Sequence, residues 1–209
     1  QRIYSEPRQE WAGSWSLILL SGMEASNRED VRRALSWLGF APFSANLLAH
    51  PAPDEAQLSE ELQRIDPDKK LLFMSAKVDE TRQAYLRDLV RRAWELDELS
   101  ARYREFLNRF RPAYQAARRA KRINPEAAFQ VRTLLIHEYR KILLRDPLLP
   151  DVLLPGRWDG IAAYQLCRNL YGLIAAPAEE FLQESMESAD GPLPPAEPRF
   201  YQRFDGLNS

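Results

Sequence analysis

The spacing of apolar residues changes near residue 80 of this 209-residue chain. Up to that point, short apolar runs alternate with stretches in which apolar residues recur every three or four positions, a pattern that indicates strands alternating with helices. Beyond it only the three- and four-residue spacing remains, which is typical of amphipathic helices. The sequence therefore predicts an α+β domain over 11–79, followed by an all-helical domain over 80–187.

The order of the elements predicted within 11–79 narrows the fold of that domain. Each predicted strand is a short apolar run bounded by turn residues, and Asn27 is expected to cap the first helix. Strand, helix, extended stretch, helix and strand in this order indicate a split βαβ, ferredoxin-like unit. The predicted elements are strands at 15–20 and 71–74, helices at 27–38 and 55–65, and an extended stretch at 43–49.

Prolines set the predicted ends of the helices that follow. A proline inside a helix removes a backbone hydrogen bond and clashes with the preceding turn, so Pro112 is expected to end one helix and Pro147 to follow the end of another. Pro177 is expected to begin a shorter helix, and the proline-rich residues 188–209 are expected to form a tail. The predicted segments are helices at 80–110, 125–145, 159–175 and 177–187, with a short basic helix or turn at 114–122.

The formal net charge of −1 conceals a strongly basic stretch. Residues 102–145, here called the basic segment, carry 12 basic and 3 acidic side chains, whereas both flanking parts of the chain are acidic. Ten of the 12 are arginines, whose planar guanidinium groups bind phosphates and carboxylates through paired hydrogen bonds. The segment therefore predicts either an anionic partner or a solvated helix face that pairs with the acidic C-terminal third.

Sequence motifs for catalysis and metal binding are missing. The eight glycines form neither a P-loop nor a dinucleotide fingerprint. Cys167 is the only cysteine, which excludes an intrachain disulfide and a multi-cysteine metal site. His137 and Glu138 begin like a zinc-protease motif, but Lys141 stands where the second histidine is required. We therefore expect a protein that is not an enzyme and that carries no metal and no cofactor.

The longest apolar runs fall well short of the roughly 18 residues that a membrane-spanning helix needs, and no signal-peptide pattern opens the chain. We therefore expect a cytoplasmic protein without membrane contact.

Several sequence blocks, spread over essentially the whole chain, are familiar when taken together. Arg2-Ile3-Tyr4 and Trp11-Ala12-Gly13-Ser14-Trp15 come first, and further blocks lie at 94–99, 135–141, 145–150, 153–158, 163–171 and 201–208. Together they resemble the PaaX family of transcriptional repressors, which control phenylacetic acid degradation in bacteria.

The resemblance implies a ferredoxin-like βαββαβ central domain, similar to the CRISPR-associated Cas2 proteins, followed by a helical C-terminal domain. It also implies an N-terminal winged-helix domain that reads operator DNA and that is absent from this chain, with residues 1–10 as the linker from it. Family members act as homodimers and are released from DNA by phenylacetyl-CoA. We therefore expect the effector-binding and dimerisation portion of a repressor of phenylacetate catabolism. Because the chain starts at Gln1 rather than Met, we expect a fragment of a longer repressor.

The basic segment suits such an effector, because a coenzyme A thioester carries roughly four negative charges beside an apolar acyl group. The same cations would also suit the DNA phosphates that flank an operator. The residues expected to contact the effector phosphates are Arg118, Arg119, Lys121 and Arg122, with Arg140 or Lys141, and the expected aromatic contacts are Tyr139 and Trp158.

Two alternatives of other classes remain open. One is an enzyme that acts on an aromatic acyl-CoA thioester, with His137 as the only histidine near the basic segment. The other is a nuclease, suggested by the Cas2-like fold, although fold alone does not carry function. No metal-binding carboxylate lies in or just after the predicted strand at 15–20.

Overall fold

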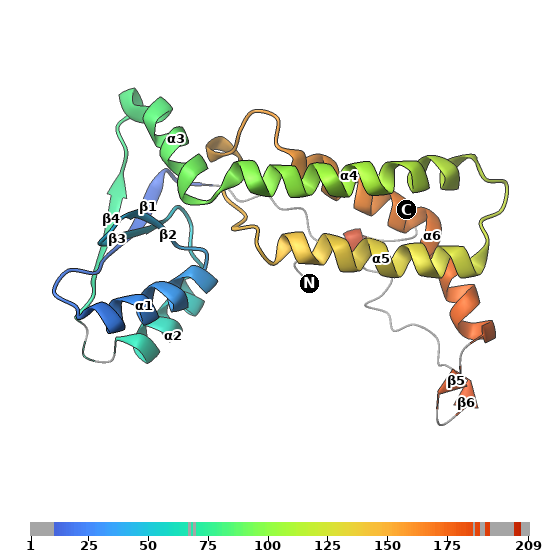
Figure 1. Ribbon diagram of the computed structural model, residues 1–209, viewed down its shortest axis with the longest axis horizontal. Coiled ribbons are helices and arrows are strands. Elements are labelled where there is room, and N and C mark those ends of the chain that lie inside the picture. Colours follow the sequence, from blue (N-terminus) through green and yellow to red (C-terminus); the bar gives the residue numbers. More distant parts are fainter. Residues whose placement is uncertain are drawn as a thin grey trace. The chain divides into compact units, whose positions relative to one another are not determined.

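The computed structural model describes residues 11–66, 68, 70–185, 187–188, 191–192 and 203–205. The chain divides into two compact units (Figure 1). In the described part of the chain, the first comprises residues 11–97 and 147–156, and we call it the sheet unit. The second comprises residues 98–146 and those from 157 onward, and we call it the helical unit. The predicted linker at 1–10 and most of the predicted tail at 188–209 lie outside the described residues.

The sheet unit has the predicted βαββαβ order. Its four strands form one antiparallel sheet in the order β2-β3-β1-β4. The predicted extended stretch is in fact a hairpin of two strands joined at Ala45 and Asn46. Its turn lacks the Asn-Gly pair that marks such hairpins in a sequence. The elements are β1 (Ser14–Leu19), α1 (Ala25–Trp37), β2 (Ala41–Ser44), β3 (Leu47–His50), α2 (Glu55–Ile65) and β4 (Leu72–Lys77).

Side chains at alternate positions along β1 and just after it build the core between the sheet and its helices. Ile18 and Leu20 are fully buried against Val31 and Leu35 of α1 and Leu58 of α2, so both helices cover the same face of the sheet. Trp15 points to the other face, where its ring lies 5.2 Å from Phe43 and 6.2 Å from Trp94.

The first helix begins earlier than predicted. Its N-cap residue is Glu24, which makes no side-chain capping hydrogen bond, and Asn27 lies in the first turn of α1 rather than at the cap. The carbonyl of Glu24 accepts from the backbone N–H of Arg28, and the Arg28 guanidinium donates to the carbonyl of Met23. These two bonds close the first turn without a capping side chain, so the prediction from Asn27 was wrong.

Gly39 follows α1 and has a backbone conformation that residues with a side chain rarely adopt. Its φ is +88°, and a Cβ added there would lie 2.9 Å from Nε2 of the buried His50. The imidazole is held in place, because its Nδ1 accepts from the backbone N–H of Ala52 at 3.0 Å and its ring lies 5.3 Å from Phe40.

Replacement of Gly39 by alanine is therefore expected to lower the free energy of unfolding more than Gly22→Ala does. Both glycines have positive φ values, which cost an L-residue about 1–2 kcal/mol, but nothing lies within 4 Å of a Cβ at Gly22. The clash with His50 should add about 1–3 kcal/mol. Denaturant titration of the two variants measures the difference, and equal losses would contradict the clash.

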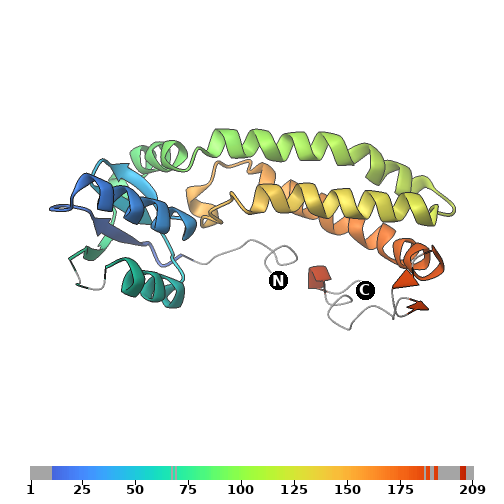
Figure 2. The same cartoon turned by 60° about the horizontal axis from the view of Figure 1, so that its bottom comes forward.

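Long helices make up most of the rest of the chain. In the helical unit, α4, α5 and α6 run side by side (Figure 2). The remaining helices are α3 (Gln83–Ala93), α4 (Leu96–Arg119), α5 (Pro125–Leu143) and α6 (Asp159–Ser185), with 3-10 turns at Glu80–Arg82, Asp151–Leu153 and Arg203–Asp205 and short strands β5 (Glu187–Ser188) and β6 (Gly191–Pro192).

Two proline-based predictions were wrong. Helix α4 continues through Pro112 to Arg119, so the predicted stop and the separate segment at 114–122 do not occur. Helix α6 continues through Pro177 instead of ending near residue 175. Buried Ala175 and Ala178 lie on either side of Pro177, and their packing helps to offset the cost of about 3 kcal/mol for an interior proline.

One helix break occurs at a position without a proline. The predicted helix at 80–110 is interrupted at Trp94 and Glu95, where Glu95 has a φ of +48°. The Trp94 indole Nε1 donates to the carbonyl of Gly39 at 2.8 Å. This bond ties the end of α3 to the loop before β2 within the sheet unit.

Candidate functional site

The basic segment occupies α4, α5 and the turn between them. About half of its cations pair with nearby carboxylates, as the solvated-face interpretation predicts. Some of these carboxylates belong to the acidic C-terminal third of the chain. The pairs are Arg102–Glu98 at 2.6 Å, Arg104–Asp159 at 3.7 Å, Arg109–Glu105 at 3.1 Å, Arg109–Glu138 at 3.2 Å, Arg122–Glu180 at 3.4 Å, Lys141–Glu138 at 3.3 Å, and Arg132–Glu179.

The end of α4 and the turn that follows it carry four exposed cations, Arg118, Arg119, Lys121 and Arg122, which we call the turn cations. Among the described residues, the first three have no carboxylate within ion-pair distance, and Arg122 has only the 3.4 Å contact with Glu180. The Arg118 guanidinium lies 5.7 Å from the centre of the Tyr114 ring. The turn therefore presents concentrated positive charge that is largely free of internal partners.

Arg140 and Lys141 do not join the turn cations. Helix α5 begins at Pro125, just after the turn, so Arg140 lies about 22 Å further along the helix axis at 1.5 Å per residue. Figure 1 shows the turn at one end of the α4–α5 pair and the last turn of α5 at the other. A single phosphate cluster cannot contact both ends of the pair.

The two aromatic residues predicted to contact the effector lie toward the far end of this pair. Tyr139 is 1% exposed, and its ring packs 5.4 Å from Phe106 of α4. Burial raises its pKa. Trp158 is half-buried and lies edge-on to Tyr103, near the start of α4, at 5.8 Å. Tyr139 is thus a core residue, and neither ring adjoins the turn cations.

The only cysteine and the histidine near the basic segment lie in different environments. Cys167 is fully buried in α6, and burial raises the pKa of its thiol. His137 lies exposed on α5. Within the described ranges, no group of three or more His, Cys, Asp or Glu side chains is placed to hold a metal ion. In the same ranges, no helix is both long and apolar enough to span a bilayer.

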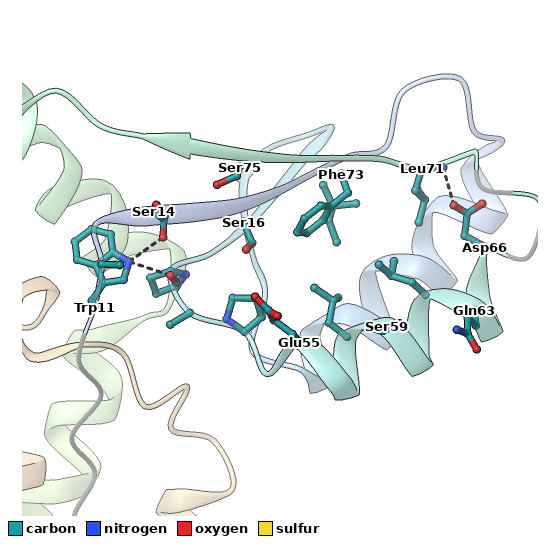
Figure 3. A pocket seen from close by; sticks show the side chains of 17 residues that line it. Trp11, Ser14, Ser16, Glu55, Ser59, Gln63, Asp66, Leu71, Phe73 and Ser75 are labelled. Atoms are coloured by element: carbon teal, nitrogen blue, oxygen red, sulfur yellow. Dashed lines mark hydrogen bonds between the residues drawn. The ribbon is translucent and has the colours of Figure 1, made fainter.

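A cavity of about 1060 Å³ in the sheet unit was not predicted (Figure 3). It lies between the helix-facing side of β1 and β4 and the helix α2. Ser14 and Ser16 of β1 line it on the same face of the strand as the core residue Ile18. Small polar residues on a core-facing strand are the signal in the sequence that indicates this cavity.

Two models of known protein families match this chain. Residues 8–87 match the model of the PaaX protein central Cas2-like domain, and residues 94–184 match that of the PaaX-like protein C-terminal domain. The chain belongs to the PaaX family. Both the family and the Cas2-like α+β fold predicted from the sequence are thereby confirmed.

Comparison with individual proteins also finds relatives of this PaaX family member. The transcriptional repressor PaaX of Escherichia coli K12 is 36% identical over 99% of this chain. This chain spans 66% of the length of that repressor, just under two thirds. A solved structure of an uncharacterized protein from Mycobacterium tuberculosis matches 83% of this chain and 65% of its own, with a TM-score of 0.54. At 18% identity, that match shows a shared fold alone.

Proposed function

We propose that this chain is the effector-binding and dimerisation portion of a bacterial transcriptional repressor of phenylacetate catabolism. The observation that carries the proposal is the 36% identity to the repressor PaaX along 99% of this chain. The repressor binds operator DNA through an N-terminal winged-helix domain and acts as a homodimer. Phenylacetyl-CoA releases it from DNA, and the chain acts as a regulator rather than as an enzyme.

The turn cations are the best-placed phosphate contacts for such an effector. Arg118, Arg119 and Lys121 have no internal carboxylate to give up among the described residues, so an incoming phosphate breaks no ion pair. Guanidinium–phosphate hydrogen bonds are charge-assisted and about twice as strong as neutral ones. The arrangement supports binding of the coenzyme A phosphates at the turn, rather than by Arg140 or Lys141.

Charge reversal at the turn is expected to weaken effector binding. The double variant Arg118→Glu/Arg119→Glu should bind phenylacetyl-CoA at least tenfold more weakly than the parent chain, because two attractive charges become repulsive ones. Arg140→Glu is the matched control, since it reverses an exposed arginine about 22 Å along α5 and should leave the affinity unchanged. Isothermal titration calorimetry with phenylacetyl-CoA, coenzyme A and phenylacetate measures both effects, with circular dichroism as the check on folding.

The same variants separate effector binding from DNA binding. If the turn instead serves DNA phosphates, the parent chain should bind duplex DNA weakly, without sequence preference and with a steep salt dependence. Arg118→Glu/Arg119→Glu would then abolish that binding and leave the affinity for phenylacetyl-CoA unchanged. An unchanged effector affinity in the double variant overturns the proposed phosphate site.

A further inference from the structure

The floor of the cavity in the sheet unit is lined by serine hydroxyls. Ser16 of β1 and Ser75 of β4 are directly paired across the two strands, and Ser14 lies two residues before Ser16 on the same face. Among the described residues, the side chains of Ser14, Ser16 and Ser75 make no hydrogen bond to the protein. Their hydroxyls are therefore available to a bound molecule, both as donors and as acceptors.

The walls of the cavity are mainly apolar and include aromatic rings. Leu58 and Leu62 of α2 face the floor, and Figure 3 shows Trp11 at one end of the cavity and Phe73 on β4 further along it. The Trp11 indole is fixed in orientation, because its Nε1 donates to the carbonyls of Ser14 at 2.8 Å and Pro51 at 2.9 Å. Phe73 is 47% exposed although its side chain is large and apolar. Both rings thus offer apolar surface to an aromatic ligand.

The charges around the cavity disfavour an anionic ligand. None of its 17 lining residues is a lysine or an arginine, and two of them, Glu55 and Asp66, are acidic. The carboxylate of Asp66 is occupied by the backbone N–H groups of Lys70 at 2.7 Å and Leu71 at 2.8 Å. Glu55, exposed at the start of α2, adds a negative charge to the surroundings of the cavity. The cavity therefore differs in chemistry from the turn cations.

We propose that this cavity binds a small, uncharged aromatic molecule that carries an amide or a similar polar group. The aromatic ring lies between Trp11 and Phe73, and the polar group bonds to the serine hydroxyls of the floor. A volume of about 1060 Å³ is slightly above the usual range of ligand pockets, roughly 300–1000 Å³, so a small aromatic molecule fits with room to spare. This site does not depend on the proposed effector site and belongs to the sheet unit alone.

A matched pair of ligands tests the proposed chemistry. Indole-3-acetamide and indole-3-acetate have the same shape and differ mainly in charge. Calorimetric titration of the whole chain should show the amide binding at least fivefold more tightly than the carboxylate, because no cation lines the cavity to offset the negative charge. Equal or tighter binding of the carboxylate, or no binding of the amide at millimolar concentration, overturns the proposal.

Substitutions that fill the cavity locate the binding. Ser16→Leu places a bulky side chain on the floor and should weaken binding of indole-3-acetamide at least tenfold. Ser75→Leu should weaken binding in the same way. Because Ser75 is exposed on the edge strand β4, this variant can still test the proposal if Ser16→Leu fails to fold. Ser36→Leu is the control, since Ser36 is exposed on α1 outside the cavity. Loss of affinity in Ser36→Leu, or full affinity in Ser75→Leu, would place the ligand elsewhere and overturn the assignment.

Discussion

Replacement of Phe204 by alanine is expected to lower the free energy of unfolding of the helical unit by about 3–5 kcal/mol, the usual cost of deleting a buried aromatic side chain. Phe204 is 1% exposed, and its ring centre lies 5.9 Å from that of Tyr164 and 5.3 Å from that of Tyr171, both on α6. The ring therefore fills a site in the core that alanine would leave as a cavity.

The neighbouring arginine strengthens the same attachment. Nη1 of Arg203 donates to the hydroxyl oxygen of Tyr171 at 2.7 Å, so the 3-10 turn Arg203–Asp205 contacts α6 through a ring and a hydrogen bond together. Part of the sequence that was predicted to be a loop or tail thus contributes a core side chain.

The measurement needs a control for side-chain volume. Phe204→Leu keeps most of the apolar volume and the same backbone φ of +54°, so it should cost clearly less than Phe204→Ala. Denaturant titration followed by far-ultraviolet circular dichroism gives both values, and the two units are fitted as separate transitions if they unfold separately. A loss below about 1 kcal/mol for Phe204→Ala would show that the ring is not part of the core.

The spacing of apolar residues predicted most elements of the sheet unit. The apolar run before Ser21 and the stripe that contains Val31 and Leu35 led to β1 and α1, whereas the full βαββαβ order came from the family resemblance. The hairpin at Ala45 and Asn46 was missed, because the turn has no glycine to mark it. Local spacing specifies strands and helices well, but it specifies short turns poorly.

Prolines misled the prediction of the helices for a physical reason. The cost of Pro112 and Pro177 is local and fixed, whereas the packing of a long helix accumulates along its whole length. The sequence pattern indicates the local cost of a proline, but it does not show which side chains become buried and offset that cost. The break at Glu95 was missed because no glycine or asparagine marks its left-handed backbone in the sequence.

The candidate site shows the same division between local and distant contacts. The pairs Arg102–Glu98 and Lys141–Glu138 follow from helix spacing alone. The separation of Arg140 from the turn cations follows from the rise along α5, which a count of charges along the sequence ignores. The cavity depends on the pairing of Ser16 with Ser75, and that register is set only in the folded sheet.

The ion pair between Arg132 of α5 and Glu179 of α6 joins parts of the chain 47 residues apart, and its two side chains are only 11% and 19% exposed. Arg132→Met is expected to lower the free energy of unfolding by about 3–5 kcal/mol, because it leaves a largely buried carboxylate without its cation. The surroundings are apolar, since the Arg132 guanidinium lies 6.0 Å from the Phe129 ring, which packs 5.3 Å from Phe181.

Removal of both charges is expected to recover most of this loss. In Arg132→Met/Glu179→Leu, two apolar side chains of similar length meet beside Phe129 and Phe181, and neither charge remains to be desolvated. The double-mutant cycle isolates the interaction between the two side chains. Arg102→Met is the matched control, because its partner Glu98 is 59% exposed and the loss of such a pair costs at most about 1 kcal/mol. Thermal and denaturant unfolding measure Arg132→Met, Glu179→Leu, the double variant and Arg102→Met. A loss in Arg132→Met no larger than in Arg102→Met would show that water screens this pair as it does a surface pair.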